Sequence, residues 1–227
     1  RSVAASHSSG LAPGSPDPPL ALALAYAPRD ARPVFQDLFA LDRRLADAVR
    51  QASEPIIAQL KLAWWRDRFA QSPAEWPKGE PLLARLAAWD ADISRLGGLV
   101  DGWEQLAAAE ELTRDVAIAF AGRRARSWAV AASALHVAEA DAVVAAGMRW
   151  ALADLAQHCA SEAESALVRA VAADLGHASA ESPGLPRNLR PFAILGVLGG
   201  RALLRERPML STGGDFLAAV RTGMLGR

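Results

Sequence analysis

One apolar stripe constrains the fold of this chain more than any other feature. Val34, Leu38, Leu41, Leu45 and Val49 follow one another at spacings of four, three, four and four residues. This spacing places all five side chains on one face of an α-helix, whereas a half-buried strand alternates apolar and polar residues. Similar helical spacing recurs along the chain, and we find no alternating stretch of useful length. The sequence therefore predicts an all-α fold.

Capping residues, prolines and glycines divide the chain into helices. We predict helices over residues 20–27, 30–52, 53–69, 80–89, 92–109, 110–135, 139–159, 162–175, 189–206 and 214–225. Residues 1–19 are rich in Ser, Pro, Gly and Ala, and we predict a flexible tail there. Residues 20–227 are predicted to form a single-domain helical bundle, because 227 residues with 52% hydrophobic content suffice for one core.

The helix predicted over residues 53–69 is unusually apolar. Ser53 is a candidate N-cap, Glu54 lies at the positive end of the helix dipole, and Pro55 fits the first turn. The adjacent indoles of Trp64 and Trp65 point about 100° apart on a helix. We therefore expect this helix to have apolar neighbours on two sides and to lie at the centre of the domain.

Composition excludes several classes of function. The formal net charge is +0, which gives no bias toward nucleic acid, and the single Cys159 excludes an intrachain disulfide. No run of 18 uncharged apolar residues is present, so we expect no transmembrane segment. P-loop, dinucleotide-binding and serine-hydrolase motifs are absent from the sequence. We expect a cytoplasmic protein, at most peripheral to a membrane, without a nucleic-acid partner.

Arginine supplies nearly all of the 25 basic residues, since lysine occurs only at Lys61 and Lys78. Arg123, Arg124 and Arg126 form a cluster that suits a diphosphate or an anionic lipid head group. The alternative is a solvated helix face, which the general arginine bias of the chain favours.

Several segments resemble the squalene/phytoene synthase family. They are Tyr26-Ala-Pro-Arg29, residues 34–45, Ser53-Glu54-Pro55 with Leu62-Ala-Trp64-Trp65-Arg66, Leu185-Pro186 and Arg190-Pro191-Phe192. The resemblance implies an isoprenoid synthase fold, in which helices surround a central apolar cavity. In that family two Asp-rich motifs hold Mg²⁺ against prenyl diphosphates. The candidate cavity or ligand residues are Tyr26, Trp64, Trp65, Arg66, Trp150 and Phe192. The alternative for the aromatic ones is plain core.

The Asp-rich motifs depart from the family's pattern. A DxxxD pair places two carboxylates about 40° apart on one helix face. Asp37, Asp42 and Asp47 lie five residues apart, so that neighbours in this series diverge by about 140°. At the second motif, Asp154 is followed by His158, a poor pair for Mg²⁺. Asp42, Asp47, Asp154 and His158 remain the metal candidates, and the alternatives are Asp–Arg pairs on the surface and an Asp–His hydrogen bond.

The segment at residues 54–66 is similar to a branch of the family that includes a mitochondrial complex I assembly factor. This resemblance implies a non-catalytic protein with no cofactor. Such a protein binds an isoprenoid, a quinone or a lipid, or acts in the assembly of a membrane complex with a protein partner. Two alternatives remain open. One is an active Mg²⁺-dependent prenyl transferase that uses Asp42, Asp47 and Asp154, and the other is a helical scaffold with a filled core.

Overall fold

The computed structural model describes residues 17–138, 141–182 and 184–226, and within these ranges it is built from helices without a strand. The α-helices are α1 (Pro18–Ala25), α2 (Arg32–Arg50), α3 (Pro55–Phe69), α4 (Pro81–Leu86), α5 (Gly97–Ala108), α6 (Arg114–Ala134), α7 (Asp141–His158), α8 (Glu162–Asp174), α9 (Arg190–Arg205) and α10 (Gly213–Leu225). Three 3-10 turns join them, namely η1 (Pro73–Glu75), η2 (Ile93–Leu96) and η3 (Arg187–Leu189). The predicted all-α bundle is confirmed.

The predicted helices are all present, with shifted ends. The predicted helix at 92–109 begins as the 3-10 turn η2 before it continues as α5. The helix α1 begins at Pro18, inside the predicted tail, and residues 1–16 of that tail lie outside the described residues. At the predicted break near Ser161, the hydroxyl of Ser161 caps α8 in a reciprocal capping box with Glu164. None of the described helices is long and apolar enough to cross a membrane.

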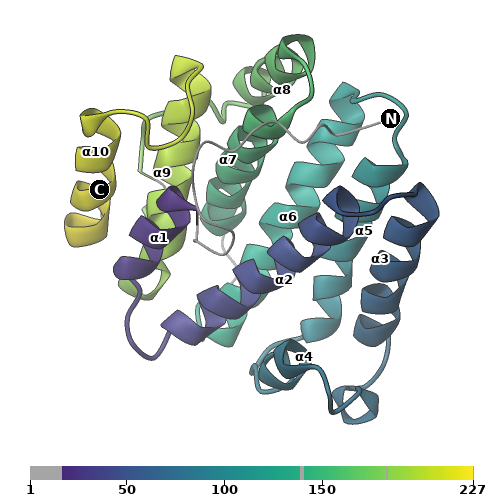
Figure 1. Cartoon of the computed structure of the whole chain (residues 1–227). Coiled ribbons are helices and arrows are strands. Elements are labelled where there is room, and N and C mark those ends of the chain that lie inside the picture. Colours follow the sequence, from purple (N-terminus) through teal and green to yellow (C-terminus); the bar gives the residue numbers. More distant parts are fainter. Residues whose placement is uncertain (1–16, 139–140, 183, 227) are drawn as a thin grey trace.

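Four helices form the body of the molecule. In Figure 1, α5, α6, α7 and α9 follow one another across the fold, and α7 packs extensively on both α6 and α9. The helix α2 runs across one face of this row, α10 lies beyond α9, and α3 lies beyond α5. The apolar stripe of α2 therefore faces the row, which explains why Leu38, Leu41 and Leu45 are buried.

Small residues bring the inner helices close together. A Cβ atom added to Gly147 on α7 would lie 2.8 Å from the Cα atom of Ala125 on α6. A Cβ atom added to Gly199 on α9 would lie 2.6 Å from the carbonyl oxygen of Arg149 on α7. Both distances are shorter than any normal contact, so each glycine permits a separation that a side chain would prevent. The close approach of α6 and α7 positions the charged residues described below.

The expectation of a central, doubly covered α3 is wrong. This helix lies at one edge of the bundle, where it packs on α2, α5 and η2 (Figure 1). Its inner face buries Ala58, Leu62, Trp65 and Phe69, while the outer face leaves Ile56, Ile57, Leu60 and Trp64 exposed. The second apolar side that the sequence indicated is thus real, but no described helix covers it. Ser53 is not the cap either, because the N-cap position is Glu54, without a side-chain capping bond.

Aromatic rings fill the space between α2, α6, α7 and α9. Trp128 stacks on Phe192 with 4.1 Å between ring centroids. Phe39 meets the edges of Trp128, Trp150 and Phe192 at centroid distances of 6.1, 5.5 and 6.3 Å. These separations are those of packed aromatic pairs. Trp150 and Phe192, two of the candidate cavity residues, therefore pack directly against other aromatic rings.

Candidate functional site

Three ionised side chains from distant parts of the chain meet beside the aromatic core. Arg124 on α6 donates from Nη2 to Oδ2 of Asp42 on α2 at 2.6 Å and from Nε to Oδ1 of the same carboxylate at 3.2 Å. Its third nitrogen, Nη1, donates to Oδ2 of Asp154 on α7 at 2.7 Å. One guanidinium thus bridges two carboxylates, and it binds the first of them in the two-pronged geometry that suits arginine.

Aromatic rings surround the bridging cation. The guanidinium carbon of Arg124 lies 4.2 Å from the ring centre of Trp150, 5.2 Å from that of Phe120 and 5.4 Å from that of Trp103. These are cation–π distances. Trp103 has a second role, because its indole Nε1–H donates to Oδ1 of Asp42 at 2.9 Å. The site is therefore a cation held between two carboxylates in an aromatic setting.

The cluster is largely removed from water. Arg124 is 3% exposed and Asp42 is 8% exposed. Burial works against the charge on Arg124, but the charges of Asp42 and Asp154 outweigh it and raise the arginine pKa. Burial also tends to raise the pKa of Asp154, whereas the charge and hydrogen bond of Arg124 and the charge of His158 bring that pKa below its ordinary value. Arg124 and Asp154 therefore both stay charged at neutral pH.

A histidine and a third carboxyl group lie at the rim of the cluster. The Nδ1 atom of His158 lies 2.7 Å from the backbone oxygen of Asp154 and 3.4 Å from its Oδ1 atom. Asp17, which precedes α1, has a pKa raised to about 6 by partial burial and by the charge of Asp154, although His158 lowers it. The two metal candidates on α7 thus form a hydrogen-bonded pair at the open side of the Arg124 cluster.

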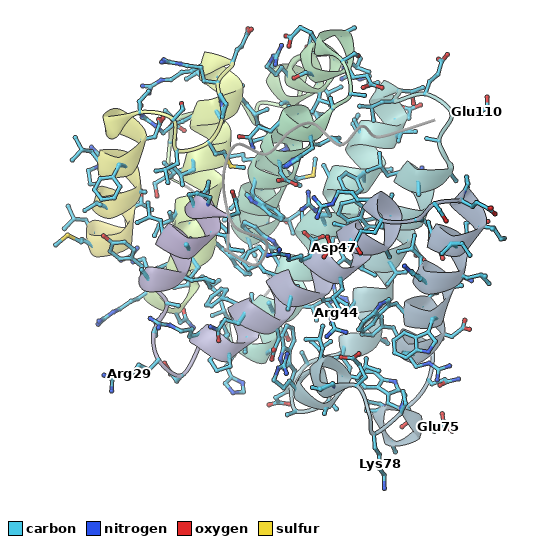
Figure 2. All side chains as sticks on the ribbon, in the orientation of Figure 1. Arg29, Arg44, Asp47, Glu75, Lys78 and Glu110 are labelled. Carbon is cyan, nitrogen blue, oxygen red and sulfur yellow. The ribbon has the colours of Figure 1, made fainter. Side chains whose placement is uncertain are left out.

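Asp47 does not belong to this cluster. Its carboxylate pairs with Arg50 at 2.7 Å and with Arg43 at 3.9 Å, which are contacts within one helix. Figure 2 shows Asp47 and Arg44 on the part of α2 that crosses the face of the molecule. The structure therefore separates the metal candidates: Asp42 and Asp154 share Arg124, His158 touches Asp154, and Asp47 is a surface residue in intrahelical pairs.

The candidate cavity residues also divide into separate groups. Trp150 and Phe192 lie in the aromatic core, and Trp65 is buried on the inner face of its own helix, α3. Trp64 is 37% exposed, and Arg66 pairs with Glu104 of α5 through two hydrogen bonds of 2.9 and 2.7 Å. Tyr26 lines a surface pocket of about 560 Å³, together with Ala25, Ala27, Pro28, Arg29, Arg187 and Asn188. These six candidates thus do not line one cavity.

The pocket at Tyr26 is an open hollow in the surface and lies apart from the Arg124 cluster. Its polar lining comes from Arg29, Arg187 and Asn188, of which the two arginines are exposed. Figure 2 shows Arg29 projecting away from the body of the protein. The polar side chains of the pocket therefore do not converge on one point, whereas those of most ligand sites do.

The arginine cluster of the sequence splits in the structure. Arg123 pairs with Asp101 of α5 at 3.0 Å, Arg124 is buried, and Arg126 is exposed. In the sequence, Arg124 was only one of three candidate ligands for a diphosphate or lipid head group, a solvated helix face was favoured for all three, and nothing indicated the carboxylate partners of Arg124. Trp103 was missed altogether. The available signal was the polar strip of Arg124 and Ser127 within the apolar surroundings of α6, both of which are buried.

The described residues contain no group of three or more histidine, cysteine, aspartate or glutamate side chains that suits a metal ion. The two carboxylates that face each other, Asp42 and Asp154, already share a cation from the protein itself. The guanidinium of Arg124 thus occupies the position between the two carboxylates and neutralises their charge. No family model, no curated protein and no solved structure matches this chain.

Proposed function

We propose that this chain is a non-catalytic relative of the squalene/phytoene synthases that acts by binding or assembly. The observation that carries the proposal is the position of Arg124. Its guanidinium bridges Asp42 and Asp154, the aspartates nearest to the places where the family resemblance puts its two metal-binding motifs. Mg²⁺ requires several oxygen ligands and bound water, whereas both carboxylates here are directed to a fixed organic cation.

The packing of the aromatic rings favours a role in assembly over the transport of a prenyl chain. A bound isoprenoid, quinone or lipid tail requires a continuous apolar cavity of about 300 Å³ or more. Trp128, Trp150, Phe39 and Phe192 instead contact one another through their rings. The function proposed is therefore exerted by the outer surface of a rigid helical body, with a protein as the partner.

Two measurements on the purified chain test this proposal. Thermal unfolding with and without about 5 mM Mg²⁺ is expected to give the same midpoint, because the carboxylates have no free ligand position. Incubation with farnesyl diphosphate and Mg²⁺ is expected to give no condensed product above a protein-free blank. Product formation that disappears in Asp42→Asn would overturn the proposal in favour of a prenyl transferase.

Native mass spectrometry separates the assembly role from a carrier role. The expected spectrum contains the bare polypeptide of 24.0 kDa or its multiples. An isoprenoid or quinone that stays bound to the wild type and is lost from Trp128→Ala would assign the aromatic core to ligand binding and refute the assembly role.

A further inference from the structure

The outer face of α3 carries an apolar ridge that none of the described residues covers. Ile56, Leu60 and Trp64 recur every fourth residue and are 51%, 61% and 37% exposed. Ile57 lies beside them and is 38% exposed. On this helix of 15 residues the ridge is an apolar strip about 12 Å long from Ile56 to Trp64. Since the opposite face of α3 is buried in the bundle, the helix has the composition of one covered on both sides.

Charged residues accompany the ridge on one flank. Glu54, Lys61 and Arg68 are seven residues apart, nearly two helical turns, and therefore lie along the same side of α3. Glu54 lies at the N-terminal end of this flank and Arg68 lies at its C-terminal end. Within the described residues Glu54 has no ion-pair partner, and the Nε atom of Arg68 is buried without a hydrogen-bond partner. The guanidinium of Arg68 lies 5.6 Å from the Trp64 ring.

We propose that a second copy of this chain covers the ridge, with the two α3 helices antiparallel about a two-fold axis near Leu60. In that arrangement Leu60 faces its own copy, and Ile56 of each chain lies beside Trp64 of the other. The two-fold axis places equal flanks together, so that Glu54 of each chain approaches Arg68 of the other. A parallel pair would instead place the two Glu54 side chains at the same level on opposite flanks, away from either Arg68, and would align the helix dipoles.

The apolar ridge and the two Glu54–Arg68 pairs are self-complementary, as a two-fold interface requires, whereas Lys61 lies opposite its own copy near the axis and opposes association. A single helix pair buries less area than the about 800 Å² per partner of a standard interface, and we expect a dissociation constant in the micromolar range. Within the described residues, the side-chain hydrogen bonds of Arg124 go to α2 and α7 and not to α3. Failure of the dimer would therefore leave the proposed function untouched, and failure of the proposed function would leave the dimer untouched.

Sedimentation velocity of the full chain, followed over a concentration series, tests the dimer. The wild type is expected to shift from a 24.0 kDa monomer to a dimer as concentration rises. Glu54→Arg and Arg68→Glu each create two like-charge contacts per dimer and are expected to weaken self-association about tenfold. An equimolar mixture of the two variants restores both contacts in a heterodimer and is expected to associate like the wild type.

An apolar contact variant with a matched control completes the design. Leu60→Glu places two charges at the centre of the contact and is expected to weaken association about a hundredfold. Leu217→Glu on α10 changes an equally apolar side chain that is 68% exposed and is expected to leave association unchanged. Circular dichroism confirms that each variant is folded.

Three results would overturn the dimer. The first is a wild type that stays monomeric up to about 0.5 mM. The second is a mixture of Glu54→Arg and Arg68→Glu that associates no better than either variant alone. The third is monomeric protein that binds vesicles of anionic phospholipid through Leu60, which would assign the ridge to a membrane surface.

Discussion

Replacing Arg124 with methionine is the most direct test of the charge cluster. The substitution keeps the length of the side chain but leaves Asp42 and Asp154 without their shared cation. Removing one partner of a buried ion pair typically costs about 3–5 kcal/mol, because the remaining charge stays desolvated. For a chain of this size that loss lowers the midpoint of thermal unfolding by about 6–20 °C.

The pH dependence gives the prediction its sign. In the wild type the folded state lowers the pKa of Asp154. Ionised Asp154 therefore stabilises the fold at any pH above the pKa of the unfolded chain, and this contribution is lost as pH falls through the lower pKa of the folded state. In Arg124→Met the main lowering cause is gone and burial raises the pKa of Asp154. The folded variant then binds a proton that the unfolded chain does not, so its stability rises as pH falls from 7 toward 5.

Urea unfolding followed by tryptophan fluorescence measures both effects. Arg123→Met is the matched control, because Arg123 makes a half-exposed ion pair with Asp101 at 3.0 Å, and its loss is expected to cost at most about 1 kcal/mol. Combining Asp42→Asn and Asp154→Asn with Arg124→Met is expected to recover most of the loss, since no buried charge remains. A loss below about 1 kcal/mol in Arg124→Met, or a pH profile like that of the wild type, would refute the reasoning.

Three further predictions concern packing, capping and titration. Gly147→Ala is expected to destabilise the fold by about 1–3 kcal/mol in thermal unfolding, because its Cβ atom would lie 2.8 Å from Ala125, whereas Gly79→Ala meets nothing within 4 Å and serves as the control. Ser161→Ala removes the cap of α8 and is expected to cost about 1 kcal/mol in urea unfolding, while Ser161→Asp is expected to retain most of the stability. The pKa of Asp17 is raised to about 6, so the folded state holds this proton more tightly and stability falls as pH rises from about 4 through 6. Asp17→Asn is expected to remove that step from the pH profile of the melting temperature, and an unchanged step would contradict the assignment.

Helix positions were predictable because they depend on local signals. Ser161 with Glu164 behind it marked the start of α8, and Gly176, which adopts a φ of 72°, marked the position after the C-cap Leu175. The stripe of α2 was predictable for the same reason, since its buried leucines follow the helical period. These features need only neighbouring residues to be recognised.

Pairings between helices were not predictable in the same way. The contact of Arg124 with Asp42 joins residues that are 82 positions apart, and no local pattern specifies it. The predicted central position of α3 was wrong for a related reason. In sequence, an apolar residue such as Leu60 is the same whether another helix of the chain or another molecule covers it. Composition gives the tendency to be buried, but only the three-dimensional arrangement identifies what covers a face.

The Arg124 cluster also has a consequence for the order of folding. Its hydrogen bonds close loops of 82 and 30 residues, and the indole of Trp103 closes one of 61 residues to Asp42. Closing each loop costs conformational entropy before the contact that it forms contributes stabilising free energy. We therefore expect helix pairs that are neighbours in sequence, such as α6 and α7, to assemble first, and the contact of Arg124 with Asp42 to form late. Because contacts that form after the folding barrier govern the rate of unfolding, we expect the loss of this cluster to speed unfolding more than it slows folding.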